Sequence, residues 1–100
     1  MLRSLVTIVT LLLAGCVTSP PVQEMSDARQ AISAAEQARP GRAAADSLDD
    51  ARRFLAEAER QIQQEAYGPA RMNAVRAKNR AMTALRSSRA SETARDQGRE

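Results

Sequence analysis

The sequence predicts an all-α fold, either an Ala-rich antiparallel helical hairpin or a three-helix bundle. Alanine is abundant, and β-branched residues are few after residue 22. Apolar residues recur at steps of three and four, which is the spacing of one face of a helix. Pro and Gly then fall at only three places, Pro40-Gly41, Gly68-Pro69 and Gly98. The first two pairs divide the chain into three helical stretches.

The first helix is expected over residues 23–39. Met25, Ala28, Ile32 and Ala35 step by three, four and three residues, so they share one helix face. Pro40-Gly41 ends this helix.

The second helix has the most regular pattern. Its apolar residues step alternately by four and three over almost three heptads. They are Ala44, Leu48, Ala51, Leu55, Ala58 and Ile62. Ser47 followed by Asp50 is compatible with a capping box, which would start the regular helix at Ser47 and leave residues 43–46 in the loop.

Gly68-Pro69, just after Tyr67, predicts a short turn, and a third helix is expected over residues 70–88. Its stripe consists of alanines, which allow another helix to approach closely. They are Ala70, Ala74, Ala77, Ala81 and Ala84. Residues 23–88 are therefore predicted to form the helical domain. No bulky apolar residue follows Leu85, so residues 89–100 are expected to form a polar, disordered tail.

Acidic and basic side chains are separated along the chain. Residues 66–91 contain six cations and no acid, whereas residues 43–65 contain six acids and three arginines. Two helices of opposite charge joined by a short turn are expected to pack as an antiparallel hairpin, and the first helix can lie against them as a third member.

Residues 1–15 have the organisation of an export signal. Arg3 precedes an apolar run from Leu5 to Leu13, and two small residues follow. Nine residues of helix cover about 14 Å, far less than the ~30 Å hydrocarbon core of a bilayer, so the run is interpreted as a signal peptide.

Leu13-Ala14-Gly15-Cys16 resembles the lipobox of bacterial lipoproteins. The resemblance implies signal cleavage between Gly15 and Cys16 and lipidation of Cys16, with a diacylglycerol on its thiol and an acyl chain such as palmitate on its new amino group. Two or three chains hold a protein firmly to a membrane. Residues 16–22 would then be the lipidated Cys and a Pro-rich tether.

The residue after the lipidated position is Val17 and not Asp. By resemblance to enterobacterial sorting, this implies an outer-membrane location facing the periplasm rather than retention at the inner membrane.

The sequence indicates no catalytic residue, no metal site and no cofactor, so an enzyme is not expected. Nucleophilic catalysis needs a Ser or Cys beside a base. The chain has no His to act as that base, and its only Cys is expected to be acylated. Asp46, Asp49 and Asp50 are interpreted as favourable charges at a helix N-terminus and not as metal ligands. Nucleic acid is not expected as a partner, because an exported chain with one Tyr and one Phe lacks aromatics for stacking.

The pattern Leu48-x-x-Ala51 … Leu55-x-x-Ala58, then Tyr67-x-x-Ala70-x-x-x-Ala74-x-x-Ala77-x-x-x-Ala81, resembles the bacterial lipoproteins that carry domain of unknown function 4398. Those proteins are small and Ala-rich, and are similar to a tetratricopeptide-type helical hairpin. The resemblance covers residues 25–88. The family's Gly-Asp-Tyr or Gly-Asn-Tyr turn is replaced here by Glu65-Ala66-Tyr67, and the glycine follows at Gly68. The resemblance implies a fold and a location in the cell envelope, but it implies no activity.

Two functions of different kinds fit these observations. The first is a lipid-anchored, non-catalytic interaction module that binds another envelope protein or itself, with Tyr67, Arg71 and Lys78 as the candidate surface. The alternative is a structural lipoprotein resembling the alanine-zipper envelope lipoproteins, which form a homo-oligomeric coiled coil. Pro40-Gly41 and Gly68-Pro69 oppose the alternative because they interrupt a continuous helix. The basic third helix has two further interpretations, pairing with the acidic second helix or binding an anionic envelope surface.

Overall fold

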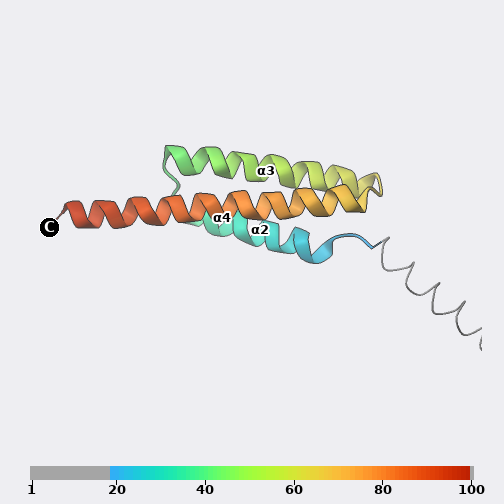
Figure 1. Cartoon of the computed structure of the whole chain (residues 1–100), viewed down its shortest axis with the longest axis horizontal. Coiled ribbons are helices and arrows are strands. Elements are labelled where there is room, and N and C mark those ends of the chain that lie inside the picture. The colour runs from blue at the N-terminus through green and yellow to red at the C-terminus, as the bar shows by residue number, and fades with distance from the viewer. Residues whose placement is uncertain (1–18, 100) are drawn as a thin grey trace, which may run out of the picture.

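The computed structural model describes residues 19–99, which form three α-helices (Figure 1). α2 covers Val22–Gln37, α3 covers Arg42–Gln63 and α4 covers Tyr67–Gly98. α2 and α4 run in the same direction, and α3 runs antiparallel to both (Figure 1). The predicted all-α class is confirmed as a three-helix bundle, and no strand occurs within residues 19–99.

Residues 1–18 lie outside the described part of the chain, and so do the predictions that concern them. These are the signal peptide over residues 1–15, cleavage between Gly15 and Cys16, and lipidation of Cys16. Within residues 19–99, no helix combines the length and the apolar character that a membrane crossing requires.

The core is built mainly from alanine. Among the apolar side chains that are buried, only Pro21, Met25, Ile32 and Leu48 are larger than alanine. The buried alanines are Ala28, Ala31, Ala35, Ala44, Ala51, Ala58, Ala70, Ala74, Ala77, Ala81 and Ala84. The predicted apolar stripes are thus confirmed, with Leu55 and Ile62 half-buried at the edge of the core. Small side chains let neighbouring helices pack closely, but each contributes little buried area.

The bundle begins earlier than the predicted boundary of the tether. Pro21 is fully buried, and its carbonyl accepts a hydrogen bond from the Met25 N–H at 3.0 Å. α2 then starts at Val22. The last residues assigned to the tether therefore belong to the folded domain, because Pro21 fixes the entry into the helix.

α3 begins at Arg42 and not at Ser47, so the capping box predicted for Ser47 and Asp50 does not form. Gly41 is the N-cap residue, and its carbonyl accepts the first helical hydrogen bond from the Ala45 N–H at 2.8 Å. Arg and Ala are strong helix formers, and Ala44 is buried, so residues 42–46 are helical.

The turn between α3 and α4 lies before Tyr67, whereas the sequence predicted it just after Tyr67. Residues 64–66 form it, and Gly68 and Pro69 belong to the first turn of α4. Proline is tolerated there because the first N–H groups of a helix have no partner within the helix.

A Schellman motif closes α3. The Ala66 N–H donates to the Gln61 carbonyl at 2.8 Å, and the Glu65 N–H donates to the Ile62 carbonyl at 3.0 Å. Glu65 takes the left-handed conformation, with φ of 61°, at the position that glycine usually occupies. The turn therefore forms without the glycine that its conformation favours.

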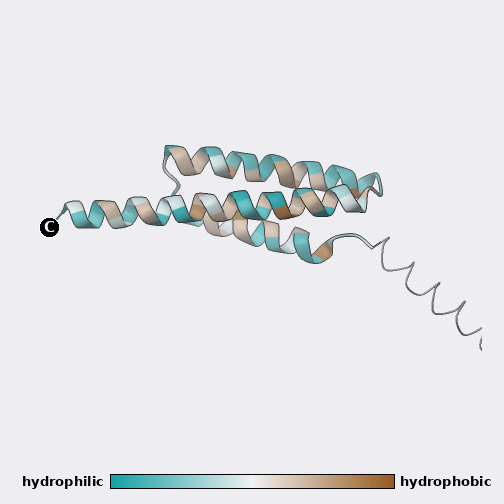
Figure 2. Ribbon diagram, viewed as in Figure 1, coloured by the Kyte–Doolittle hydropathy of each residue, from teal (hydrophilic) through white to brown (hydrophobic). Residues whose placement is uncertain are grey.

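α4 continues to Gly98, so the disordered tail predicted from residue 89 is wrong for residues 89–98. No Pro or Gly occurs between Pro69 and Gly98, and the segment is rich in Ala and Arg. The hydroxyls of Ser91 and Thr93 donate to carbonyls one turn back, at 3.0 and 3.1 Å. Figure 2 shows teal, white and pale tan along these protruding turns, without the deep brown of strongly hydrophobic residues.

The predicted charge pairing between the acidic α3 and the basic α4 is wrong. The two helices pack antiparallel, but no ion pair within residues 19–99 joins them. The interhelical ion pairs all involve α2: Arg29 with Glu59 and Arg52 with Glu36, both at 3.4 Å, and Arg71 with Glu24 at 3.2 Å. Three acids of α3 are instead paired along their own helix, at a spacing of three residues: Asp49 with Arg52, Asp50 with Arg53, and Glu57 with Arg60.

Candidate interaction groove between α3 and α4

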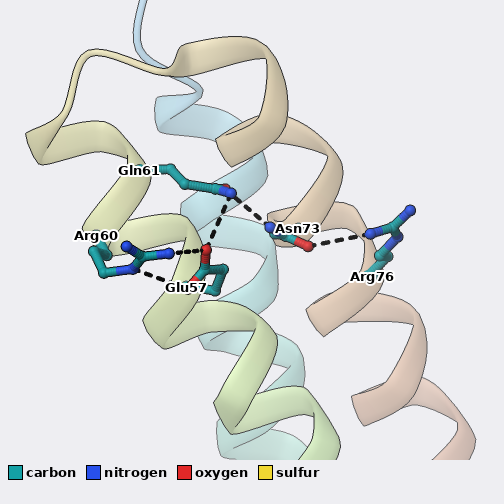
Figure 3. A network of polar contacts seen from close by, with 5 residues as sticks. All are labelled: Glu57, Arg60, Gln61, Asn73 and Arg76. Atoms are coloured by element: carbon teal, nitrogen blue, oxygen red, sulfur yellow. Dashed lines mark hydrogen bonds and ion pairs between the residues drawn. The ribbon is translucent and has the colours of Figure 1, made fainter.

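α2 covers only one face of the α3–α4 pair. In the close view of Figure 3, α2 lies behind the two helices, and the near face between them is uncovered. Two hollows of about 350 and 390 Å³ open along α3 and α4. We call these two hollows together the α3–α4 groove.

Phe54, the only phenylalanine of the chain, lines both hollows of the groove. Its side chain is half-buried and contributes to neither hydrophobic cluster of the core. Leu55, the next residue, packs against both clusters. The largest apolar side chain of α3 is therefore placed in the groove rather than in the core.

The α3 wall of the groove is acidic in sequence but neutralised in the structure. Its residues Asp50, Arg53 and Glu57 line the first hollow. Asp50 is paired with Arg53, and Glu57 with Arg60. The hydrogen bond from Arg60, assisted by its charge and opposed by desolvation, lowers the pKa of Glu57, and the same pairing raises the pKa of Arg60. The Glu57 carboxylate is thus held ionised, and each of the two carboxylates is paired with an arginine of its own helix.

A chain of polar contacts crosses the groove from α3 to α4 (Figure 3). The Gln61 amide donates to Glu57 at 3.3 Å, and the Asn73 amide donates to Gln61 Oε1 at 2.9 Å. Arg76 in turn donates to Asn73 Oδ1 at 3.4 Å. Asn73 is buried, with 8% of its surface exposed, so these bonds satisfy a polar group inside an alanine interface.

The α4 wall of the groove is basic. Arg76, Asn79, Arg80 and Thr83 line the second hollow together with Phe54. No ion pair within residues 19–99 involves Arg76 or Arg80. Along this wall the groove presents two guanidinium groups, one helical turn apart, beside an aromatic ring.

The three residues predicted as an interaction surface lie on a different flank. Tyr67, Arg71 and Lys78 are four and seven residues apart on α4, so they share one side of the helix. Tyr67 is half-buried at the start of α4, and Lys78 is exposed. Arg71 makes contacts inside the domain, with the Glu24 carboxylate at 3.2 Å and with the Ser19 carbonyl at 3.5 Å.

The groove residues were not identified from the sequence. Phe54 is adjacent to the regular stripe of α3, and its place outside the core depends on α2 covering the opposite flank. Asn73 lies directly beside Ala74 of the alanine row on α4, and the structure shows that it is buried with that row.

The acidic cluster Asp46, Asp49 and Asp50 lies along a third, open hollow that also includes Arg52 and Arg53 and shares Asp50 and Arg53 with the groove. Arginines pair with Asp49 and Asp50. Within residues 19–99, His, Cys, Asp and Glu side chains form no group of three that could hold a metal ion.

Comparison of the chain with protein-family models, curated proteins and solved structures gives no match.

Proposed function

We propose that this chain is a lipid-anchored envelope lipoprotein that acts as a small, non-catalytic helical interaction module. Cys16 carries the lipid, and the helical domain faces the periplasm from the outer membrane. The proposal includes kinship with the lipoproteins of domain of unknown function 4398, on the residues that carry the resemblance.

The α3–α4 groove is the observation that carries the binding role. A half-buried phenylalanine in an open hollow, next to unpaired arginines, has the composition of interface hot spots, in which aromatic residues and Arg are enriched. In a small domain with an alanine core, placing the largest apolar side chain outside that core is a loss of stability. Contact with a partner would compensate for this loss.

The anchor is supported by the order of the parts. The lipobox is followed by a short Pro-rich stretch, and the described domain begins at Ser19, three residues beyond Cys16. α2 and α4 both start at this end of the bundle (Figure 1). A lipid on Cys16 would therefore keep the start of α4 near the membrane surface and direct its far end away from it.

The anchor is tested by substitution of Cys16. The chain is expressed with radiolabelled palmitate, and the inner and outer membranes are separated. We expect label on the wild-type chain in the outer membrane, and neither label nor membrane retention for Cys16→Ser. Retention of the label by Cys16→Ser would contradict the proposal.

The binding role is tested by photo-crosslinking in cells. A photoreactive amino acid replaces Tyr67 or Lys78 on one flank, or Thr83 at the groove, in separate variants of the full chain. We expect one dominant adduct to another envelope protein from at least one flank. Adducts only to the chain itself from all three positions would overturn the interaction module in favour of self-assembly.

The alternative of a homo-oligomeric alanine-zipper coiled coil has less support. It requires one continuous helix, whereas residues 38–41 and 64–66 interrupt the helices and fold them back on one another. Sedimentation of the mature chain separates the two, because a three-helix bundle sediments faster for its mass than a rod.

A further inference from the structure

We propose that the α3–α4 groove binds an acidic amphipathic helix of a partner protein, with a bulky apolar side chain of that helix seated on Phe54. This inference rests on the proposed binding function and specifies the chemistry of the partner.

The partner helix is expected to be acidic because the acids of the groove already have arginine partners, whereas the arginines on the α4 wall do not. On the α3 wall, Asp50 and Glu57 each have an arginine partner on their own helix. On the α4 wall, the only side-chain acceptor of Arg76 within residues 19–99 is the neutral amide oxygen of Asn73, at 3.4 Å. Arg80 donates to no side chain in this part of the chain. The net charge offered to an occupant is therefore positive, and carboxylates are the matching groups.

The apolar contact of the occupant follows from Phe54. This ring lines both hollows, so one side chain resting on it is flanked by the neutralised wall of α3 and the arginines of α4. Burying an aromatic face with an aliphatic or aromatic side chain gives the central, desolvated contact that anchors most interfaces.

The length of the occupant follows from the spacing along α4. Arg76 and Thr83 are seven residues apart, about 10 Å along the helix. Arg76 and Arg80 are one turn apart, so a helix with two acidic residues at a spacing of three or four would match them. A helix laid into a groove uses this i, i+4, i+7 arrangement of anchors.

Two other occupants fit the groove less well. The protruding turns of α4 from a second copy carry Glu92 and Asp96 at a spacing of four, but residues 89–98 contain no bulky apolar residue for Phe54. An anionic lipid surface would meet the arginines, but a flat surface does not enter a hollow in which the ring is half-buried.

The test is photo-crosslinking from Thr83, an exposed residue that lines the second hollow. The photoreactive residue replaces Thr83 in the full, membrane-anchored chain in cells, and mass spectrometry identifies the crosslinked peptide. We expect a peptide of another protein with two Asp or Glu residues three or four apart and a bulky apolar residue next to them.

Charge-reversed variants test the arginines in the same experiment. Arg76→Glu with Arg80→Glu should lower the adduct yield at least about tenfold, because two charge-assisted contacts are lost. Arg76→Lys with Arg80→Lys should retain most of the yield. The matched control is Arg86→Glu with Arg89→Glu, which makes the same charge change at two exposed positions of the same helix outside the hollows and should leave the yield within about twofold. Circular dichroism of each variant verifies that the bundle is folded.

Each remaining outcome overturns the inference. These outcomes are an equal loss in the Arg86 and Arg89 control, a crosslinked peptide without an acidic pair, adducts to a second copy or to lipid, and no adduct from Thr83. Adducts to another protein from Tyr67 or Lys78 but not from Thr83 would reject the groove and leave the proposed interaction module in place.

Discussion

The two parts of α4 differ in environment although they form one uninterrupted helix. Residues 67–88, the packed half, bury five alanines completely against α2 and α3. Residues 89–98, the free half, are exposed throughout. Figure 1 shows the free half extending beyond the ends of α2 and α3.

The residue types of the two halves overlap, so composition alone does not explain the difference. Ala90 and Ala94 are exposed, whereas Ala77 and Ala81 have no exposed surface. At the connection over residues 38–41, α2 ends and α3 begins, so neither helix extends alongside the free half. Ser88 is the last buried residue of α4. Helix propensity therefore continues α4, but only the presence of neighbouring helices turns a stripe of alanines into a core.

The largest expected effect comes from proline in each half. Ala81→Pro removes a helical hydrogen bond and clashes with the preceding turn, which destabilises a helix by about 3 kcal/mol or more. In a small domain this is a large share of the total stability, so we expect a mostly unfolded chain. Ala94→Pro should shorten the free half without lowering Tm. Thermal unfolding followed by far-ultraviolet circular dichroism measures both.

A drop in Tm for Ala94→Pro similar to that for Ala81→Pro would contradict the comparison. It would mean that the free half is held in place under the conditions of the measurement, either by a second copy or by contacts within the chain. Repeating the melt at several chain concentrations distinguishes self-association from an intrinsic effect, since only the former makes Tm depend on concentration.

A smaller effect is expected from enlarging alanine in each half. Ala77→Leu places three extra carbons where no surface is exposed, and overpacking of this kind typically lowers stability by about 1–3 kcal/mol. Ala90→Leu adds the same atoms on an exposed face and should change stability by less than about 0.5 kcal/mol. Urea unfolding of the two variants against wild type gives the difference. Equal destabilisation by both would show that the free half is packed in solution.

The packed half was largely predictable from the sequence, and the reasons are local. Heptad-like steps in α3 and the alanine row of α4 identify the buried faces, and all five alanines of that row are confirmed as buried. The ends of the helices were predicted less well. Pro69 suggested a turn, yet proline fits the first turn of a helix, and Ser47 suggested a cap, yet strong helix formers precede it.

The free half and the groove could not be predicted, because both depend on where neighbouring helices lie. The absence of bulky apolar residues after Leu85 indicates only that this segment has no core of its own. Charge patterning also misled, since the arginines of α3 reach acids three residues away more easily than the acids reach α4. The position of Phe54 depends on α2 occupying one flank of α3, which no local pattern reveals.

The smallest expected effect concerns the pH dependence of the packed half. Glu57 has its pKa lowered below the usual 4.5, chiefly by the hydrogen bond from Arg60. The unfolded chain therefore binds a proton at Glu57 at a higher pH than the folded chain does. Stability contributed by this group is fully present above about pH 4.5 and is lost as the pH falls through the lowered pKa. The carboxylate is partly exposed, so the loss is small.

Glu57 also accepts a hydrogen bond from the Gln61 amide, which in turn accepts one from Asn73 of α4. Protonation of Glu57 therefore weakens a connection between α3 and the packed half, and it affects no contact of the free half. Urea unfolding of wild type and Glu57→Gln at neutral pH and below pH 4.5 measures the effect. We expect the wild type to lose stability toward low pH slightly more steeply than Glu57→Gln does. In hydrogen exchange, the extra loss of protection at low pH should be confined to the α4 amides of residues 67–88. Parallel pH profiles for the two chains would mean that the polar contacts across the groove do not help to hold α4 in the bundle, and that alanine packing alone does so.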